Sequence, residues 1–320
     1  MTEIRKLKMP LILCLSFWGI AVFLWQTRDN VFYLFNFGYI GTAIGLGIGL
    51  YELLPRKKKP WGRRFAQLLV GLYMLGFLGF LTKENMQLEG FFFYVLAGYF
   101  SGSVIHYAIA KIAGPVLFGR GFCGWACWTA MVLDFLPYKQ TRQGRVAAKW
   151  EKLRVVHFGV SLALVLIVWF VCSYRPTPMS SAELVWLVAG NVFYFASAII
   201  LAVTLRDNRA FCKYLCPVTV FLKATSRLAV LKIAGDREKC TRCGACNRVC
   251  PMNIDIMGYV TNGERVLSTE CIFCLTCTTV CPEGILDTTF KVDIGGKELI
   301  KRKQSGPAGG TDGETDTPRK

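Results

Sequence analysis

Charged residues are scarce in this chain of 320 residues, since Asp, Glu, Lys and Arg together make up only 18% of it. Hydrophobic residues account for 53%, and the mean hydropathy is +0.39. This composition is not that of a soluble domain and is typical of a protein that crosses a membrane several times. Acidic residues are the scarcest class of charge, with 21 against 38 Lys and Arg and a net charge of +17.

Histidine is nearly absent as well, with two in the whole chain. The sequence contains neither a P-loop nor a G-x-S-x-G nucleophile motif, which are common signatures of nucleotide-binding and hydrolytic enzymes. These absences exclude the familiar constellations for hydrolysis and group transfer. The residue that carries chemistry here is cysteine, which occurs 14 times.

Eight of these cysteines form two runs with the same spacing, C-x₂-C-x₂-C-x₃-C-P, and the second run begins 31 residues after the start of the first. This is the bacterial ferredoxin spacing, which ligates [4Fe–4S] clusters, and the fourth cysteine of each run serves the other cluster. We therefore expect two clusters, one bound by Cys240, Cys243, Cys246 and Cys281 and the other by Cys271, Cys274, Cys277 and Cys250. The rival interpretation, a pair of tetrathiolate zinc sites, usually shows C-x₂-C pairs across a longer gap.

Six apolar runs before this motif are close to the ~20 residues that a membrane-spanning helix needs. They cover Pro10–Trp25, Val31–Leu54, Phe65–Thr82, Phe91–Ala113, Val155–Tyr174 and Leu184–Leu205. Basic residues gather in alternate loops, above all in Arg56-Lys57-Lys58-Lys59 and between residues 139 and 154. Because such loops stay in the cytoplasm, we expect an inner-membrane protein with both termini cytoplasmic.

The net positive charge is explained by these loops, since residues 236–298 contain nine acids and seven bases. We therefore expect contact with membrane lipid and none with nucleic acid.

A second cysteine motif occurs twice, at a constant offset of 89 residues. Arg120-Gly-Phe-Cys123-Gly-Trp-Ala-Cys127 follows the fourth apolar run, and Arg209-Ala-Phe-Cys212-Lys-Tyr-Leu-Cys216-Pro217 follows the sixth. We call these two C-x₃-C segments the hooks. Internal repeats in membrane proteins often place a functional site at their shared interface. The hooks could together hold a further iron–sulfur or iron centre, form a redox-active dithiol, or bind another metal.

Pro217 favours the first turn of a helix, which would place Cys216 at a helix N-terminus, where its thiolate is stabilised.

The isolated polar and sulfur-containing residues of the apolar runs have less specific interpretations. His106 and His157 are expected at comparable depth in the membrane, so both could belong to one site near a quinone. A haem ligated by the two histidines is not expected. Asp134 is a candidate proton relay. Cys14 and Cys172 are expected to be packing residues.

The combination of apolar spans, two hooks and a double ferredoxin motif resembles the NapH/NosR-type membrane polyferredoxins. The resemblance covers residues from about Phe91 to Leu286. It implies electron transfer between the quinol pool or cytoplasmic donors and extracytoplasmic reductases. All eight ferredoxin cysteines carry over, and Cys212-Lys-Tyr-Leu-Cys216-Pro217 matches the family's CxxxCP form. In the first hook, Trp128 stands where the family has proline.

The sequence thus predicts a helical membrane domain with about six spans (residues 1–235), a C-terminal α+β ferredoxin domain with two [4Fe–4S] clusters (236–300) and a disordered tail (301–320). The expected function is electron transfer between the clusters and the quinone pool or a redox partner, such as a reductase, a cytochrome or a soluble donor. Such a protein would be the electron-transfer component of a quinol dehydrogenase or other oxidoreductase system. Two other hypotheses are a reductase for metal-centre maturation and a thiol-based redox sensor.

Overall fold

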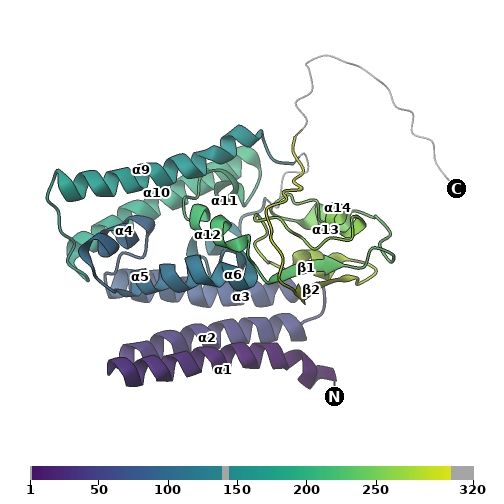
Figure 1. Cartoon of the computed structure of the whole chain (residues 1–320), viewed down its shortest axis with the longest axis horizontal. Coiled ribbons are helices and arrows are strands. Elements are labelled where there is room, and N and C mark those ends of the chain that lie inside the picture. The colour runs from purple at the N-terminus through teal and green to yellow at the C-terminus, as the bar shows by residue number, and fades with distance from the viewer. Residues whose placement is uncertain (1, 139–143, 304–320) are drawn as a thin grey trace, which may run out of the picture.

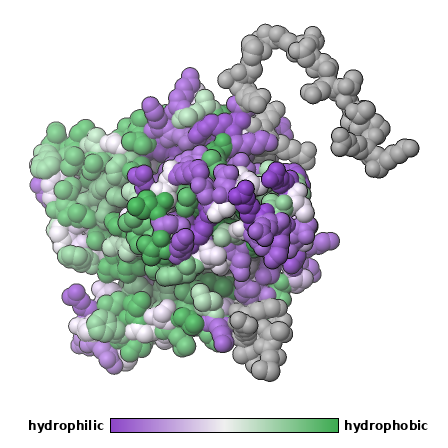
Figure 2. All heavy atoms as spheres, turned by 45° about the vertical axis from the view of Figure 1, so that its right-hand side comes forward, coloured by the Kyte–Doolittle hydropathy of each residue, from purple (hydrophilic) through white to green (hydrophobic). Residues whose placement is uncertain are grey.

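The computed structural model describes residues 2–138 and 144–303. The predicted tail lies outside the described residues from position 304 onward. Long helices form one side of the molecule, and a small domain of loops, short helices and two strands caps their ends (Figure 1). Hydrophobic side chains dominate the surface over the helices, whereas hydrophilic side chains gather over the small domain (Figure 2).

Five helical segments are long and apolar enough to cross a membrane, and a bent helix pair brings the total to as many as six. The five are Leu7–Arg28 in α1 (Thr2–Arg28), α2 (Val31–Leu53), Lys59–Leu81 formed by α3 (Lys59–Leu72) and η1 (Tyr73–Leu81), Ala148–Phe170 formed by η3 (Ala148–Lys152) and α9 (Leu153–Phe170), and α10 (Ser181–Leu205). Their long apolar sequences favour helices that satisfy all backbone hydrogen bonds internally. The protein is therefore a polytopic membrane protein, as the composition predicts.

The fourth predicted run is not one straight span. It consists of α4 (Leu88–Ala97) and a second helical stretch, Gly102–Phe118, and the two are bent by 115°. That stretch comprises α5 (Gly102–His106), η2 (Tyr107–Ala113) and α6 (Gly114–Phe118). Gly98 ends α4 at a φ of +71°, a conformation that glycine adopts without steric cost. A carboxylate oxygen of Glu84 then accepts a hydrogen bond from the Ser103 backbone N–H at 2.7 Å, which satisfies a free donor at the new helix start.

Small residues bring the first three spans together. A side chain at Gly41 would lie 2.3 Å from Phe17, and one at Gly47 would lie 2.3 Å from Ala66. Cys14 packs against Gly45 in this contact, as expected. Cys172 is exposed at the end of α9, so the prediction that it packs in the interior is wrong.

The hooks form short helical turns where the spans meet the small domain. The first hook begins in α7 (Gly121–Trp125) and is followed by α8 (Trp128–Leu133). The second begins in α11 (Ala210–Tyr214) and is followed by α12 (Thr219–Ser226). Because α12 begins at Thr219 with Val218 as its N-cap, Cys216 lies before the helix and not at its N-terminus.

The small domain is built around a two-stranded antiparallel sheet. Strands β1 (Leu231–Gly235) and β2 (Leu286–Phe290) pair with Leu231 opposite Phe290, and they enclose the two cysteine runs. Strand β1 lies within residues that the sequence assigned to the membrane domain. The three helices of the domain are α13 (Ala245–Val249), α14 (Ile256–Thr261) and α15 (Thr276–Val280).

Candidate functional site

The two cysteine runs of the small domain have matching backbone conformations. In each run, the residues before and after the second cysteine adopt positive φ, namely Arg242 and Gly244 in the first run and Phe273 and Leu275 in the second. A short helix follows, α13 or α15, and carries the third cysteine. The fourth cysteine, Cys250 or Cys281, ends that helix in an extended conformation. This geometry turns three thiols of a run towards one cavity and sends the fourth away.

Each run lines a cavity together with the last cysteine of the other run. One cavity is lined by Cys271, Cys274, Cys277 and Cys250, and the other by Cys240, Cys243, Cys246 and Cys281. The spacing predicts the same two groups. We call these the proximal cavity and the distal cavity, respectively, according to their place relative to the hooks.

The donor set of each cavity suits a cluster with one thiolate for each iron. Burial raises the pKa of Cys246 and Cys250 to about 11 and that of Cys271 to about 12. Such thiols stay protonated at neutral pH unless a metal displaces the proton. Within residues 2–138 and 144–303, no three His, Cys, Asp or Glu side chains converge closely enough to hold a single metal ion.

The four hook cysteines lie together beneath the proximal cavity. Cys212 lies within electrostatic reach of Cys123 and Cys127, and Cys216 lies within reach of the other three. Burial raises the pKa of Cys127 and Cys216, and it raises that of Cys212 to about 11. The expected activation of Cys216 by a helix N-terminus is therefore wrong, because desolvation dominates.

Three buried cations surround the hook cysteines. Lys111 is only 3% exposed, and its Nζ lies against the Phe122 ring and within electrostatic reach of Cys123, Cys127 and Cys216. No hydrogen bond or ion pair to an acidic side chain is found for it in the described part of the chain. Arg120, fully buried, has Nε and Nη2 atoms without a protein partner. Arg209 lies within reach of Cys212 and donates to the Cys123 carbonyl at 3.1 Å.

The positive charge around the hooks calls for an anion, because an unpaired buried charge costs several kcal/mol. A [4Fe–4S] cluster with four thiolates is anionic, whereas a dithiol or a disulfide is neutral. The orphaned donors of Arg120 and the unpaired Lys111 therefore fit an iron–sulfur cluster, and they do not fit a simple thiol pair.

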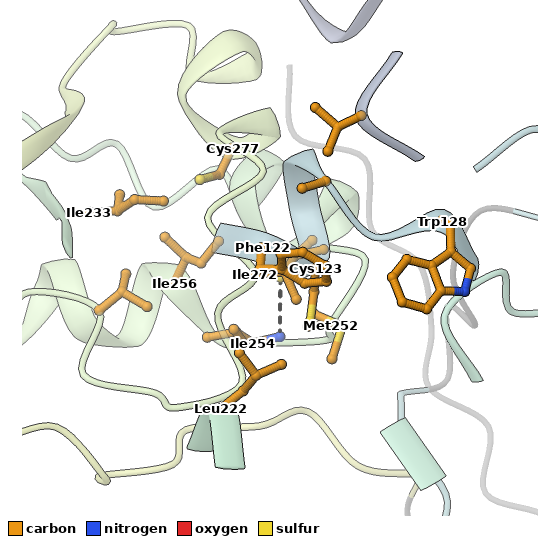
Figure 3. Packing of buried hydrophobic residues seen from close by; sticks show 14 of the residues in the cluster. Phe122, Cys123, Trp128, Leu222, Ile233, Met252, Ile254, Ile256, Ile272 and Cys277 are labelled. Carbon is orange, nitrogen blue, oxygen red and sulfur yellow. Dashed lines mark hydrogen bonds between the residues drawn. The ribbon is translucent and has the colours of Figure 1, made fainter. Parts of the chain in front are cut away.

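The first hook contacts the ferredoxin domain directly. A Cβ atom at Gly124 would lie 2.3 Å from the Ile272 carbonyl oxygen, and Trp125 Nε1 donates to the Phe273 carbonyl at 2.9 Å. In Figure 3, Phe122 and Cys123 lie next to Ile272 in a single buried cluster. The loop between Cys271 and Cys274 therefore lies against the first hook, and the proximal cavity lies between the distal cavity and the hooks.

Glu270, immediately before Cys271, joins the two domains through buried ion pairs. It is fully buried and contacts four cations: Arg120 at 2.8 Å, Arg154 at 3.0 Å, Arg145 at 3.1 Å, and Lys223. Burial opposes ionisation of Glu270, but these cations outweigh it and hold its pKa well below the ordinary value.

Asp134 has a structural role. It forms ion pairs with Arg63 and Arg209, each at 2.7 Å. Burial opposes its ionisation, but Arg209 and Arg63 lower its pKa overall, which leaves a fixed carboxylate. The interpretation of Asp134 as a proton relay is therefore not supported.

The two histidines lie at different hooks. The His106 ring packs against Phe122 in the first hook, and His157 Nδ1 is 2.8 Å from the Leu215 carbonyl in the second. Because a carbonyl only accepts, Nδ1 of His157 carries the proton.

Sequence reasoning missed Lys111, Arg120, Arg209 and Glu270. The two arginines are part of the repeated motif, and a lysine within an apolar run is itself a signal of function. Glu270 had no such signal, since its partner Arg120 is 150 residues away.

Two family models match the chain. One, described as a 4Fe-4S dicluster domain, covers residues 232–283, and the other, described as a 4Fe-4S binding domain, covers 102–142 and 189–234. The second match contains both hooks. No solved structure matches the chain.

Known relatives cover most of the chain. An uncharacterised protein of Methanocaldococcus jannaschii is 25% identical over 81% of this chain and 95% of its own length. The methylamine utilization ferredoxin-type protein MauN of Methylorubrum extorquens is 29% identical over 79% of this chain and 96% of its own length. The ferredoxin-type protein NapH of Escherichia coli is 27% identical over 62% and 70%, respectively.

The chain belongs to the NapH-type membrane polyferredoxin family. MauN and NapH are ferredoxin-type proteins, and the residues matched by the two family models include the cysteines of the cavities and the hooks. The protein is thus an iron–sulfur electron-transfer protein of a membrane.

Proposed function

We propose that the protein transfers electrons through three [4Fe–4S] clusters, between the cytoplasmic side of the inner membrane and the quinone pool or a membrane-bound redox partner. The distal and proximal cavities would hold the two ferredoxin clusters. Cys123, Cys127, Cys212 and Cys216 would hold the third. When bound, these clusters supply one-electron redox chemistry.

The observation that carries this proposal is the contact between the Cys271–Cys274 loop and the first hook. Trp125 and Gly124 hold the loop so closely that its backbone touches the hook, as described above. The three groups of cysteines are therefore arranged in a row, from the solvent-exposed distal cavity to the membrane domain. This arrangement supports a conduit, since a storage or sensor protein would not need a continuous row.

The burial of the hook cysteines supports this proposal over a redox sensor. Reactive cysteines have a lowered pKa and some exposure to solvent. Cys212 has a raised pKa and is only 6% exposed. These properties suit a ligand of a buried cluster.

Cytoplasmic orientation of the ferredoxin domain is supported by the basic loops. Arg56, Lys57 and Lys58 lie exposed between α2 and α3, near the domain, and such loops favour the cytoplasmic side.

The proposal is tested by adding a reduced quinol analogue to the purified protein in lipid nanodiscs and following the visible absorbance of the ferredoxin clusters. We expect bleaching in the wild type. The double variant Cys123→Ser/Cys212→Ser should lose this bleaching while dithionite still reduces its ferredoxin clusters. If the variant bleaches as much as the wild type, electron transfer from quinol through the hooks is contradicted. The same holds if a wild-type protein with intact clusters does not bleach.

A further inference from the structure

The distal cavity opens to solvent at one cysteine. Among the eight ferredoxin cysteines, only Cys243 is exposed, and the others are buried or half-buried. Its neighbours Thr241 and Arg242 are exposed as well. Cys243 is therefore where a soluble redox partner could come nearest to the cysteines of this domain.

Basic side chains surround this opening. Arg248 donates from Nη1 to the Cys243 carbonyl at 2.8 Å, and Arg242 lines the cavity itself. Arg56 reaches over from the loop between α2 and α3, where its Nη2 would lie 3.2 Å from a Cβ atom at Gly284. We call the following set the basic rim: Arg56, Lys239, Arg242 and Arg248.

Nearby acids only partly balance this charge. Lys239 pairs with Asp236 at 3.0 Å, and both side chains are exposed to solvent. Glu283 lines the cavity, and Glu238 is exposed next to Lys239. Four cations thus face three carboxylates around Cys243, although the ferredoxin segment as a whole contains more acids than bases.

We propose that the basic rim docks a soluble electron-transfer protein with an acidic surface, which exchanges electrons with the protein at Cys243. This inference rests on the proposed function and identifies the partner by its charge. Complementary charge steers two proteins together and raises the association rate, most strongly at low salt. A protein surface is favoured over lipid headgroups because the opening lies on the hydrophilic domain, whereas the hydrophobic surface that would face lipid covers the long helices (Figure 2).

The test uses a purified low-potential ferredoxin of net negative charge as the probe. Stopped-flow absorbance measures its oxidation by the full-length protein in nanodiscs of uncharged lipid. The rim variant is Lys239→Glu/Arg242→Glu. The matched control is Lys291→Glu/Lys297→Glu, which has the same change in charge on the same domain and likewise removes one exposed ion pair, that of Lys297 with Glu264.

At low salt we expect the rim variant to lower the second-order rate constant by about tenfold or more, and the control to change it by less than about twofold. The difference in rate constant between the wild type and the rim variant should shrink as salt is added, because salt screens the attraction. Equal rates in the two variants would overturn the proposal. A rim variant that keeps its rate with the probe but no longer binds anionic vesicles would also overturn it, because the rim would then be a lipid-binding surface.

Iron content and reduction by dithionite are measured on every sample. A protein without iron would contradict the proposed function itself. If the iron content is full and the rim substitutions leave the second-order rate constant unchanged, only the docking proposal is contradicted.

Discussion

Glu270 is the residue on which the largest number of buried charges converges. Its carboxylate, in the ferredoxin domain, is the shared partner of three arginines and a lysine that all belong to the membrane domain. Removing one member of a buried ion pair costs about 3–5 kcal/mol, because the remaining charges stay buried without compensation. We therefore expect Glu270→Gln to lower the thermal unfolding temperature markedly. Glu264→Gln, which removes a partly exposed pair with Lys297, should change it little.

The same residue predicts a pH dependence. The folded-state pKa of Glu270 lies below its ordinary value, so its ion pairs contribute their full stability above the ordinary pKa of about 4.3. This contribution is lost as the pH falls through the lowered pKa. The stability difference between wild type and Glu270→Gln should therefore be constant from pH 7 to pH 5 and shrink only in stronger acid. Chemical denaturation at several pH values measures it, and a difference that shrinks already between pH 7 and pH 5 would contradict the assignment.

Lys111 is predicted to tune the hook centre. Among the described residues, aromatic rings, His106 and the hook cysteines surround its buried ammonium group. A positive charge near a cluster favours the reduced form, which carries one more negative charge. We expect Lys111→Met to shift the midpoint potential of the hook cluster downward by tens of millivolts, measured by redox titration with electron paramagnetic resonance. Lys149→Met, at an exposed position, is the control, and an unchanged potential in Lys111→Met would contradict the role.

The cysteines could be predicted from the sequence, but the charges around them could not. The spacing of a ferredoxin run is local, so the sequence alone predicts which thiols line each cavity. The ion pairs of Glu270 join residues more than 100 positions apart, such as Arg145 and Arg154. No local pattern encodes such a contact.

Among the elements, the first hook packs closely on the ferredoxin domain. Its Gly124 lies against the Ile272 backbone, which cannot move aside without shifting the Cys271–Cys274 loop. We expect Gly124→Ala to lower stability by about 1–3 kcal/mol through overpacking and to slow electron exchange between the ferredoxin clusters and the hooks. Gly159→Ala is the matched control, because nothing lies within 4 Å of a Cβ atom there. If both variants unfold at the same temperature as the wild type, the close contact is not formed.

The spans were largely predictable at this scale, because a membrane demands long apolar helices whatever their packing. Five of the six predicted runs coincide with helices, with ends that differ by a few residues. The break at Gly98 was not predicted, because the run from Phe91 to Ala113 is largely apolar, with only Ser101, Ser103, His106 and Lys111 as strongly polar residues. The bend depends on Glu84, which lies before the run and caps the second helix.

At the level of the whole molecule, the membrane domain and the ferredoxin domain, which were predicted as separate units, are in direct contact. The ferredoxin domain caps the ends of the long helices (Figure 1), and its second cysteine run lies against the first hook. The internal repeat predicted that the hooks meet. It did not predict that the second ferredoxin run would lie on the first hook, since that contact depends on tertiary packing.

The central claim, a third cluster at the hooks, is tested most directly by counting iron and acid-labile sulfide per chain on anaerobically purified protein. The wild type should contain about twelve of each, four for each cluster. The variant with Cys123, Cys127, Cys212 and Cys216 all changed to serine should contain about eight and keep the signals of the ferredoxin clusters. A count of about eight in both proteins would contradict the third cluster.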